Sequence, residues 1–387
     1  MAHLSDASTG SVPLGASIPV VRRGSSTPGA PTRGGLADRW GRVASDLRIS
    51  LLDKCNLRCQ YCMPAEGLDW LPRASLMSAD EIFRIADVGV RLLGVEEVRF
   101  TGGEPLVRAD LVDIISRIHR AHPKLPISMT TNGIGLEKKV GALKKAGLSR
   151  INVSLDTICP QTFAELTRRD KLAEVLTGVD AAAAAGLHPI KINAVLMPGL
   201  NDTQGGELLA WALAGNYQLR FIEQMPLDAD HKWTREGTVT AGEIREKLLA
   251  DVDLAPFERP RGSSPAQLWN VYPKGTFTDT QAALEGSETT DAPALGQVGI
   301  IASVTEPFCS ACTRTRITAD GKIRSCLFSL TETDFLSALR AGITDEEFAQ
   351  IWRDAMWGKP KAHGKDSAGF ESADFQQPAR SMSAIGG

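Results

Sequence analysis

Two features are missing from this sequence of 387 residues: a long apolar run and an excess of basic side chains. Its longest run of small apolar residues, Ala181 to Ala185, is far shorter than the roughly 20 residues that a membrane-spanning helix needs. Lys and Arg number 43 against 46 Asp and Glu, which gives a formal net charge of −3. Proteins that bind nucleic acids through the phosphates need a basic surplus. We therefore expect neither a membrane nor a nucleic acid among the partners.

The N-terminus also lacks a secretory signal, so we expect a cytoplasmic protein without a framework of disulfides. Six of the seven cysteines fall into two tight groups, and Cys159 stands alone as a structural residue. Clustered cysteines in a long intracellular chain indicate metal ligands or catalytic groups. The length suits two domains, or one barrel with an appendage, and a hydrophobic content of 43% is enough for a substantial core.

Composition predicts a disordered tail over residues 1–40, which are rich in Ser, Thr, Pro and Gly. Arg22, Arg23 and Arg33 with few acidic residues also suit an organelle-targeting peptide, but frequent Pro and Gly disfavour the amphipathic helix of such a peptide. The other predicted segments are a barrel domain over 41–240, a C-terminal domain over 241–357 with a loop insertion at 279–295, and an extended tail over 358–387.

Apolar runs alternate with helical sequence in the first domain. Strands are predicted at Leu47–Leu52, Val95–Phe100, Ile127–Thr130, Ile151–Leu155, Ile190–Leu196 and Leu219–Glu223. Ser78 begins a helix through a capping box with Glu81, and Gly94 ends it. Alternating strands and helices indicate an α/β fold with a parallel sheet and outer helices. Six units suit a partial (β/α)6 TIM-type barrel, in which chemistry gathers at the carboxyl ends of the strands.

The first cysteine group follows the first predicted strand and has the spacing C-x3-C-x2-C. Its members are Cys55, Cys59 and Cys62. Thiolates are soft ligands that suit iron–sulfur clusters, zinc or copper. Three of them leave a four-ligand site incomplete, so a [4Fe–4S] cluster here would keep one iron open to a small molecule. A zinc loop and a group of reduced thiols without metal are the alternatives.

The second group also lacks a fourth thiolate. Its members are Cys309, Cys312 and Cys326. Zinc ribbons have two C-x2-C pairs, and only one is present, although His363 in the tail could in principle complete a zinc site. Arg314 and Arg316 alternate along a strand-like run, so both face one side. Two guanidinium groups beside an open iron would bind an anion such as a triphosphate; the alternative is two arginines on a solvated strand.

These motifs resemble a known family. C-x3-C-x2-C with Tyr61 before its last cysteine resembles the radical S-adenosylmethionine (SAM) superfamily. Gly102-Gly103-Glu104-Pro105 is only a turn by itself, but after the second strand it is similar to the superfamily motif that holds the SAM amino group. The resemblance over residues 46–387 narrows to the GTP 3′,8-cyclase family through three segments: Asp46-Leu47-Arg48-Ile49-Ser50, Cys312-Thr313-Arg314-Thr315-Arg316 and the terminal Gly386-Gly387.

The resemblance implies two [4Fe–4S] clusters, SAM as a cofactor and GTP as the substrate. Cys55, Cys59 and Cys62 would hold the SAM cluster, and Cys309, Cys312 and Cys326 an auxiliary cluster in a C-terminal domain that closes the barrel. The implied SAM contacts are Tyr61, Gly103, Glu104, Ser154 and Met225. The implied GTP contacts are Arg48, Arg99, Thr130, Lys191, Arg314, Thr315 and Arg316. The implied catalytic residues are Arg314, Arg316, Gly386 and Gly387, the last two through a tail that reaches the active site.

By analogy with the family, a 5′-deoxyadenosyl radical removes the 3′ hydrogen of GTP and the 3′ carbon bonds to C8 of guanine. The product would be (8S)-3′,8-cyclo-7,8-dihydroguanosine 5′-triphosphate, and the enzyme a lyase at the first step of molybdenum cofactor biosynthesis. The implied partners are an electron donor and the downstream cyclic pyranopterin monophosphate synthase; monomer and homodimer both remain open. Two other hypotheses remain: a different radical SAM enzyme with an auxiliary cluster, such as a peptide-modifying one, and a non-enzymatic zinc-binding module.

Overall fold

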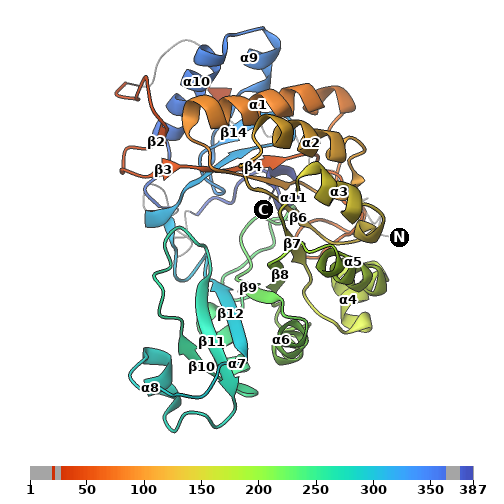
Figure 1. The fold of residues 1–387 in the computed structure, drawn as a ribbon, viewed down its shortest axis with the longest axis vertical. Helices are drawn as coiled ribbons and strands as arrows, with labels where there is room; N and C mark the ends of the chain where they lie inside the picture. Colours follow the sequence, from red (N-terminus) through yellow and green to blue (C-terminus); the bar gives the residue numbers. More distant parts are fainter. Residues whose placement is uncertain (1–19, 22–27, 363–374, 387) are drawn as a thin grey trace, which may run out of the picture.

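The structure is a computed structural model of the chain and describes residues 20–21, 28–362 and 375–386. Six neighbouring parallel strands form the centre of its main sheet (Figure 1). They are β4 (Asp46–Ser50), β5 (Glu97–Thr101), β6 (Ile127–Thr131), β7 (Arg150–Ser154), β8 (Ile190–Val195) and β9 (Gln218–Ile222). Each end lies within about two residues of its prediction, the usual uncertainty of element boundaries. The apolar runs identified these strands because each strand is buried under helices.

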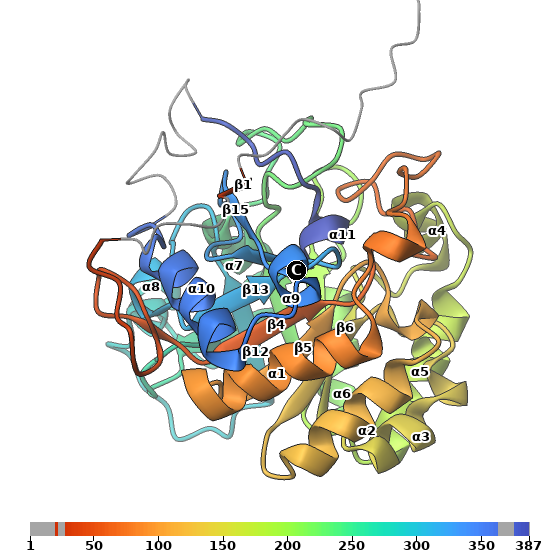
Figure 2. The ribbon, with the colours of Figure 1, turned by 90° about the horizontal axis from the view of Figure 1, so that it is seen from above.

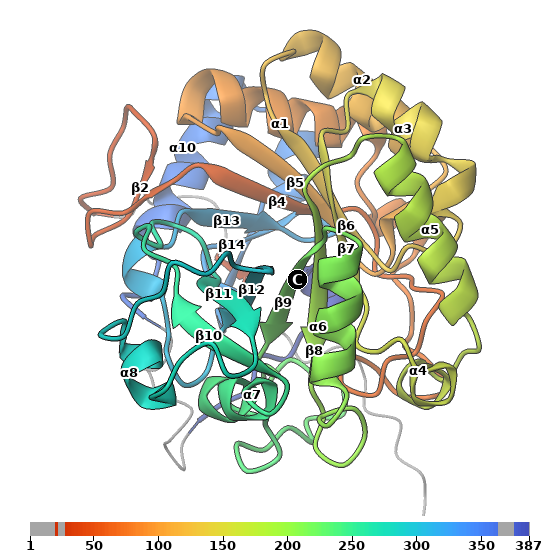
Figure 3. The same cartoon turned by 60° about the horizontal axis from the view of Figure 1, so that its bottom comes forward.

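Helices cover the outer face of this sheet (Figure 3). They are α1 (Ala79–Leu93), α2 (Leu111–Ala121), α3 (Val140–Ala146), α4 (Pro160–Thr167), α5 (Leu172–Ala184) and α6 (Gly205–Ala214). The predicted capping box of α1 is confirmed: the Ser78 hydroxyl accepts from the Glu81 amide, and the Glu81 carboxylate accepts from the Ser78 amide. Gly94 ends the helix with a φ of 72°, a conformation that glycine adopts without strain.

The C-terminal part of the chain extends the sheet at both of its edges. Its elements are α7 (Ala241–Leu248), β10 (Val252–Pro256), β11 (Gln267–Pro273), α8 (Thr280–Glu285), β12 (Gly296–Ile301), β13 (Arg314–Ile317), β14 (Lys322–Arg324), β15 (Glu332–Asp334), α9 (Leu336–Arg340), α10 (Asp345–Trp357) and α11 (Met382–Ile385). Strand β12 pairs in parallel with β9, and β13 pairs in parallel with β4. The predicted partial barrel is confirmed, and in the described residues the sheet stays open, because its two outermost strands, β10 and β1 (Val20–Val21), do not pair with each other.

Three loop or tail predictions need correction. Residues 279–295 contain the short helix α8, whose first turn is capped by the Asp279 carboxylate. The predicted disordered tail over residues 1–40 is wrong at two places: β1 (Val20–Val21) pairs with β15, and β2 (Leu36–Ala37) pairs with β3 (Val43–Ala44), with Leu36 fully buried. The C-terminal tail likewise contains a helix, α11, which lies near the centre of the molecule (Figure 2). Residues 1–19, 22–27 and 363–374 lie outside the described part.

Alternation along each strand separates the core from the interior of the barrel. In β4, Leu47 and Ile49 are fully buried under the helices, and Arg48 faces the other way. The register places Arg316, Arg48 and Arg99 side by side on β13, β4 and β5. A row of three cations therefore faces the interior. No helix of the described residues is both long and apolar enough to span a membrane.

Candidate active site

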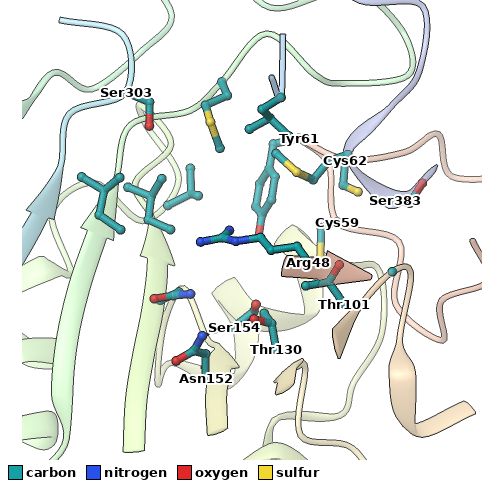
Figure 4. A pocket seen from close by; sticks show the side chains of 18 of the residues that line it. Arg48, Cys59, Tyr61, Cys62, Thr101, Thr130, Asn152, Ser154, Ser303 and Ser383 are labelled. Carbon is teal, nitrogen blue, oxygen red and sulfur yellow. Dashed lines mark hydrogen bonds between the residues drawn. The ribbon is translucent and has the colours of Figure 1, made fainter. Parts of the chain in front are cut away.

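One cavity occupies the interior of the partial barrel, and both cysteine groups line it. The predicted site residues on its wall are Arg48, Cys55, Cys59, Tyr61, Cys62, Arg99, Gly103, Glu104, Thr130, Ser154, Met225, Cys309, Cys312, Arg314, Arg316 and Cys326. Figure 4 shows Arg48 reaching into the middle, with Tyr61, Cys59 and Cys62 on one side. The fold thus brings together the two cysteine groups, which lie far apart in the sequence.

Backbone hydrogen bonds hold the first cysteine loop against the C-terminal end of α4. The Arg58 and Gln60 amides donate to the carbonyls of Thr167 and Leu166, both at 3.0 Å. Within the loop, the Cys62 amide donates to the Cys59 carbonyl at 2.9 Å. The loop is therefore shaped before any ligand binds.

Glycine is required where this loop meets the second strand. The Gly103 amide donates to the Leu52 carbonyl at 2.7 Å, and the Glu104 amide donates to the Lys54 carbonyl at 2.8 Å. A Cβ at Gly103 would lie 2.2 Å from the Lys54 carbonyl oxygen and 2.3 Å from that of Asp53. Only glycine admits this approach, and it brings the Gly-Gly-Glu-Pro segment directly against the residues before Cys55.

The three cysteines of the first group are half-buried. Burial raises the pKa of Cys55 to about 11 and that of Cys62 to about 12, and it raises the pKa of Cys59 as well. These thiols are therefore protonated at neutral pH in the apo chain. A bound cationic metal centre would supply the positive charge that ionises them.

Two buried carboxyl groups flank the first cysteine group. Glu104 accepts from the Thr131 hydroxyl and the Asn132 amide, both at 2.6 Å. Burial raises the pKa of Glu104 to about 7, against the lowering effect of these hydrogen bonds. Asp156 accepts from the Tyr61 hydroxyl at 2.8 Å and so orients the ring, and burial raises the pKa of Asp156 to about 6.

The second cysteine group lies beside a lysine and an arginine. The Cys312 thiol accepts from Lys359 Nζ at 3.3 Å and from Arg314 Nη1 at 3.8 Å. Burial raises the pKa of Cys312, but these two positive charges outweigh burial and lower it to about 7. Part of the Cys312 population is therefore a thiolate at neutral pH even without metal.

Both cysteine groups present three soft donors to a shared cavity, and soft donors of this number suit an iron–sulfur cluster with one open iron. Among the described residues, no three His, Cys, Asp or Glu side chains are placed to hold a single metal ion. His363, the alternative zinc ligand, lies outside the described residues.

Buried guanidinium groups with unused hydrogen-bond donors lie between the two cysteine groups. The Nε atoms of Arg48 and Arg220 are buried without a hydrogen-bond partner among the described residues. Burial lowers the pKa of Arg220 to about 9 and that of Arg316 to about 10, and it lowers the pKa of Arg48. Nearby guanidinium groups add to each shift. Buried cations with unused donors form an anion site.

Three predicted residues occupy other positions. Lys191 does not line the cavity; burial and the neighbouring Arg220 lower its pKa to about 8, so it lies close to the cationic wall. Thr315 is fully buried, and its hydroxyl accepts from Trp352 Nε1 at 2.9 Å. The Gly386 carbonyl accepts from Arg316 Nη1 at 2.9 Å, which brings the tail to the cavity. Gly387 lies outside the described residues.

Several residues that line the cavity are not expected from the sequence. Arg220 carries the same signal as Lys191, a single cation between apolar strand residues, and that signal could have identified it. Asp156 follows Ser154 in the same segment, but its bond to Tyr61 depends on the tertiary structure. The other cavity residues not selected include Asn152, Asn193, Ser303, Phe308, Met382 and Ser383.

Comparisons with known proteins extend these observations. Residues 49–212 match the radical SAM superfamily, and residues 217–365 match the family described as Molybdenum Cofactor Synthesis C. The chain is 61% identical over 353 residues to a GTP 3′,8-cyclase of Paenarthrobacter nicotinovorans, covering 91% of this chain and 97% of that one. It is 53% identical over 369 residues to a GTP 3′,8-cyclase of Streptomyces coelicolor, covering 95% and 100%. A crystal structure of Streptococcus suis SuiB bound to S-adenosylmethionine aligns with a TM-score of 0.49 at 18% identity, covering 81% and 65%.

Proposed function

This chain belongs to the GTP 3′,8-cyclase family of the radical SAM superfamily, and from that premise we propose how its residues divide the reaction. It is a radical SAM GTP cyclase of molybdenum cofactor biosynthesis that uses SAM and two [4Fe–4S] clusters. The observation that carries the proposal is that two groups of three cysteines and a set of buried arginines line one cavity.

At one end of the cavity, we propose that three cysteines hold the cluster that binds SAM. These are Cys55, Cys59 and Cys62, with Tyr61, Gly103, Glu104, Ser154 and Met225 as the SAM contacts. Gly103 lets the backbone approach the ligand, and the Glu104 carboxylate is placed to accept hydrogen bonds from an amino group. When bound there, the cluster and SAM would supply a 5′-deoxyadenosyl radical for removal of the 3′ hydrogen of GTP, the chemistry that leads to the bond between the 3′ carbon and guanine C8.

At the other end, the auxiliary cluster is assigned to Cys309, Cys312 and Cys326. The GTP contacts on the cavity wall are assigned to Arg48, Arg99, Thr130, Arg314 and Arg316, and we add Arg220. Lys191 lies behind this wall and Thr315 is buried, so we assign to Lys191 a contribution of charge and to Thr315 a contribution of its backbone. The buried guanidinium groups neutralise the triphosphate and so fix the ribose and base between the two cysteine groups. This orientation replaces a random encounter with a held geometry, which lowers the entropic part of the barrier.

The C-terminal tail completes the wall on the arginine side. Arg316 donates to the Gly386 carbonyl, and Met382 and Ser383 line the cavity. We assign Gly386 and Gly387, with Arg314 and Arg316, to catalysis, because the Gly386 carbonyl orients the Arg316 guanidinium group and Arg314 lines the same cavity. Positioning these groups before the substrate binds avoids the cost of reorganising them during the reaction.

The product would be (8S)-3′,8-cyclo-7,8-dihydroguanosine 5′-triphosphate, which a cyclic pyranopterin monophosphate synthase would consume. The reaction needs an external electron donor. We propose a cytoplasmic enzyme, since cysteine ligands require a reducing compartment. A monomer and a homodimer both suit a cavity that one chain builds by itself.

The test is anaerobic reconstitution with iron and sulfide, followed by addition of SAM and a strong reductant. Mass spectrometry would then quantify 5′-deoxyadenosine and any isomer of GTP, with and without GTP. We expect Cys55→Ser to abolish 5′-deoxyadenosine, Cys312→Ser to abolish the GTP isomer, and Cys159→Ser, outside both groups, to match the parent. Formation of 5′-deoxyadenosine that is indifferent to GTP, without the isomer, would instead support the peptide-modifying hypothesis, and bound zinc without iron would support the zinc module.

A further inference from the structure

A buried lysine lies directly against the second cysteine group. Lys359 is only 4% exposed. Its Nζ atom lies 2.8 Å from the Arg314 carbonyl, 3.4 Å from the Cys312 carbonyl and 3.3 Å from the Cys312 thiol. An ammonium group has three donors, and these three acceptors account for all of them. Lysine is almost never buried unless it is paired, and of these three acceptors the Cys312 thiol is the one that belongs to a side chain.

The backbone around Lys359 is held in place from two sides. The Lys359 amide donates to the Met356 carbonyl at 3.0 Å, which continues the C-terminus of α10. The Lys359 carbonyl accepts from Trp40 Nε1 at 3.1 Å, so the segment before β3 fixes the lysine from outside. The backbone at Lys359 is therefore fixed, and the ammonium group is held beside Cys312.

A second buried cation holds the other cysteine of the C-x2-C pair. Arg42 is paired with Asp38 at 2.5 Å and donates from Nη1 to the Cys309 carbonyl at 2.7 Å. The same guanidinium group donates to the carbonyls of Pro360 and Lys361, at 2.6 and 2.8 Å. Residues 38–42, residues 359–361 and the cysteine loop thus form one hydrogen-bonded unit, which links the start and the end of the folded chain.

We propose that Lys359 is a positioning residue of the auxiliary site, which holds the Cys312 sulfur in its ligating orientation and raises the reduction potential of the cluster bound there. This inference rests on the proposed auxiliary site of Cys309, Cys312 and Cys326. Hydrogen bonds to the sulfurs and nearby net charge are the main means by which a protein tunes an iron–sulfur cluster. A positive charge beside a ligand sulfur stabilises the reduced, more negative cluster. Arg314, whose Nη1 is 3.8 Å from the same sulfur, makes the weaker contact.

The test isolates the auxiliary cluster in the full-length chain. Replacing Cys55, Cys59 and Cys62 with Ser removes the other cluster, so iron content and electron paramagnetic resonance report on the auxiliary site alone. In this parent, Lys359→Met and Lys359→Gln remove the charge, and Lys359→Arg keeps it. Lys361→Met is the matched control, since it removes one charge from an exposed side chain in the same segment.

We expect a redox titration of Lys359→Met to give a lower midpoint potential than the parent. The expected shift is at least tenfold in the ratio of reduced to oxidised cluster at a fixed potential, about 59 mV for one electron. Lys359→Arg should recover most of this shift, and Lys361→Met should show none. If Lys359→Met does not fold, as judged by circular dichroism, the same comparison is made with Lys359→Gln, which keeps N–H donors.

Two failures are distinguishable. If the midpoints of the Lys359 variants coincide with that of Lys361→Met while iron remains bound, the role of Lys359 is only structural and the inference is wrong. If Cys312→Ala in the same parent retains all of its iron, the auxiliary site itself is wrong, and the proposed function fails with it.

Discussion

Replacing Gly103 with alanine should displace the first cysteine loop without unfolding the barrel. The new Cβ would lie 2.2 Å from the Lys54 carbonyl oxygen and 2.3 Å from that of Asp53. Such contacts essentially never occur below 3.0 Å, so the backbone before Cys55 must move by about 0.8 Å in a tightly packed region. Backbone atoms, unlike the end of a flexible side chain, cannot rotate away.

The energetic cost follows from the hydrogen bonds that this movement breaks. The Gly103 amide to the Leu52 carbonyl and the Glu104 amide to the Lys54 carbonyl, at 2.7 and 2.8 Å, both span the gap that must widen. At about 1 kcal/mol each, with a further strain term, the binding conformation loses about 2 to 3 kcal/mol. The Kd for SAM should therefore rise roughly 30- to 140-fold.

Calorimetric titration of SAM into the anaerobically reconstituted protein measures this change, together with iron content. Gly141→Ala is the control: it lies in α3, and no atom is within 4 Å of the Cβ that it would add. That variant should bind SAM like the parent and be stabilised by up to about 1 kcal/mol. The reasoning is refuted if Gly103→Ala binds SAM within threefold of the parent with full iron content.

Three further perturbations test other parts of the site. Gly386→Ala should undock the tail, because the new Cβ would lie 2.0 Å from Thr101 Oγ1 and the φ of Gly386 is +79°. The unfavourable φ alone costs about 1 to 2 kcal/mol, so kcat should fall about tenfold. Limited proteolysis should then cleave near the C-terminus, and an uncut tail would contradict this. Burial raises the pKa of Glu104 from 4.5 to about 7, so the folded apo chain binds this proton more tightly than the unfolded chain. The unfolding free energy should therefore fall by up to about 3 kcal/mol as the pH rises from 4.5 to 7. Glu104→Gln should flatten this pH dependence in urea unfolding, and an unchanged slope would rule out Glu104 as its source. Arg324 pairs with Glu332 at 2.6 Å, and both side chains are 1% exposed. Arg324→Met should therefore lower the unfolding free energy by about 3 kcal/mol. A loss below about 0.5 kcal/mol in urea unfolding, as expected at a surface position, would show that the pair is not stabilising.

Local signals explain which parts of the fold were predictable. The six central strands and the capping box of Ser78 depend on residues close in sequence, so patterning identified them. Helices α8 and α11 are too short for a clear helical period and were missed. Helix α11 depends on distant contacts such as the hydrogen bond from the Met382 amide to the Leu227 carbonyl. Residues 36–40 were assigned to the tail because composition does not show that Leu36 packs in the core.

The site divides in the same way. The cysteines and arginines stood out because their spacing is itself unusual, and the structure brings both groups to one cavity. Lys359 gave no signal, because its partners lie far away along the chain and a lysine in a polar tail is ordinary. Arg42 gave no signal either, because the Cys309 and Pro360 carbonyls that it contacts are distant in sequence. Residues that orient the cysteines through tertiary contacts can be identified only from the structure.

The two-sided attachment of the C-terminal part sets an order on folding. Strands β4 and β9 are the edges of the six-stranded barrel, and their outer neighbours β13 and β12 come later in the chain. Both edges therefore stay unpaired until the C-terminal part has been synthesised. Pairings between such distant strands give a high contact order, which predicts slow folding. Exposed parallel edges also invite pairing with other chains. A ribosome-bound or truncated barrel half should therefore aggregate or recruit chaperones, and the cavity exists only after the last strands have docked.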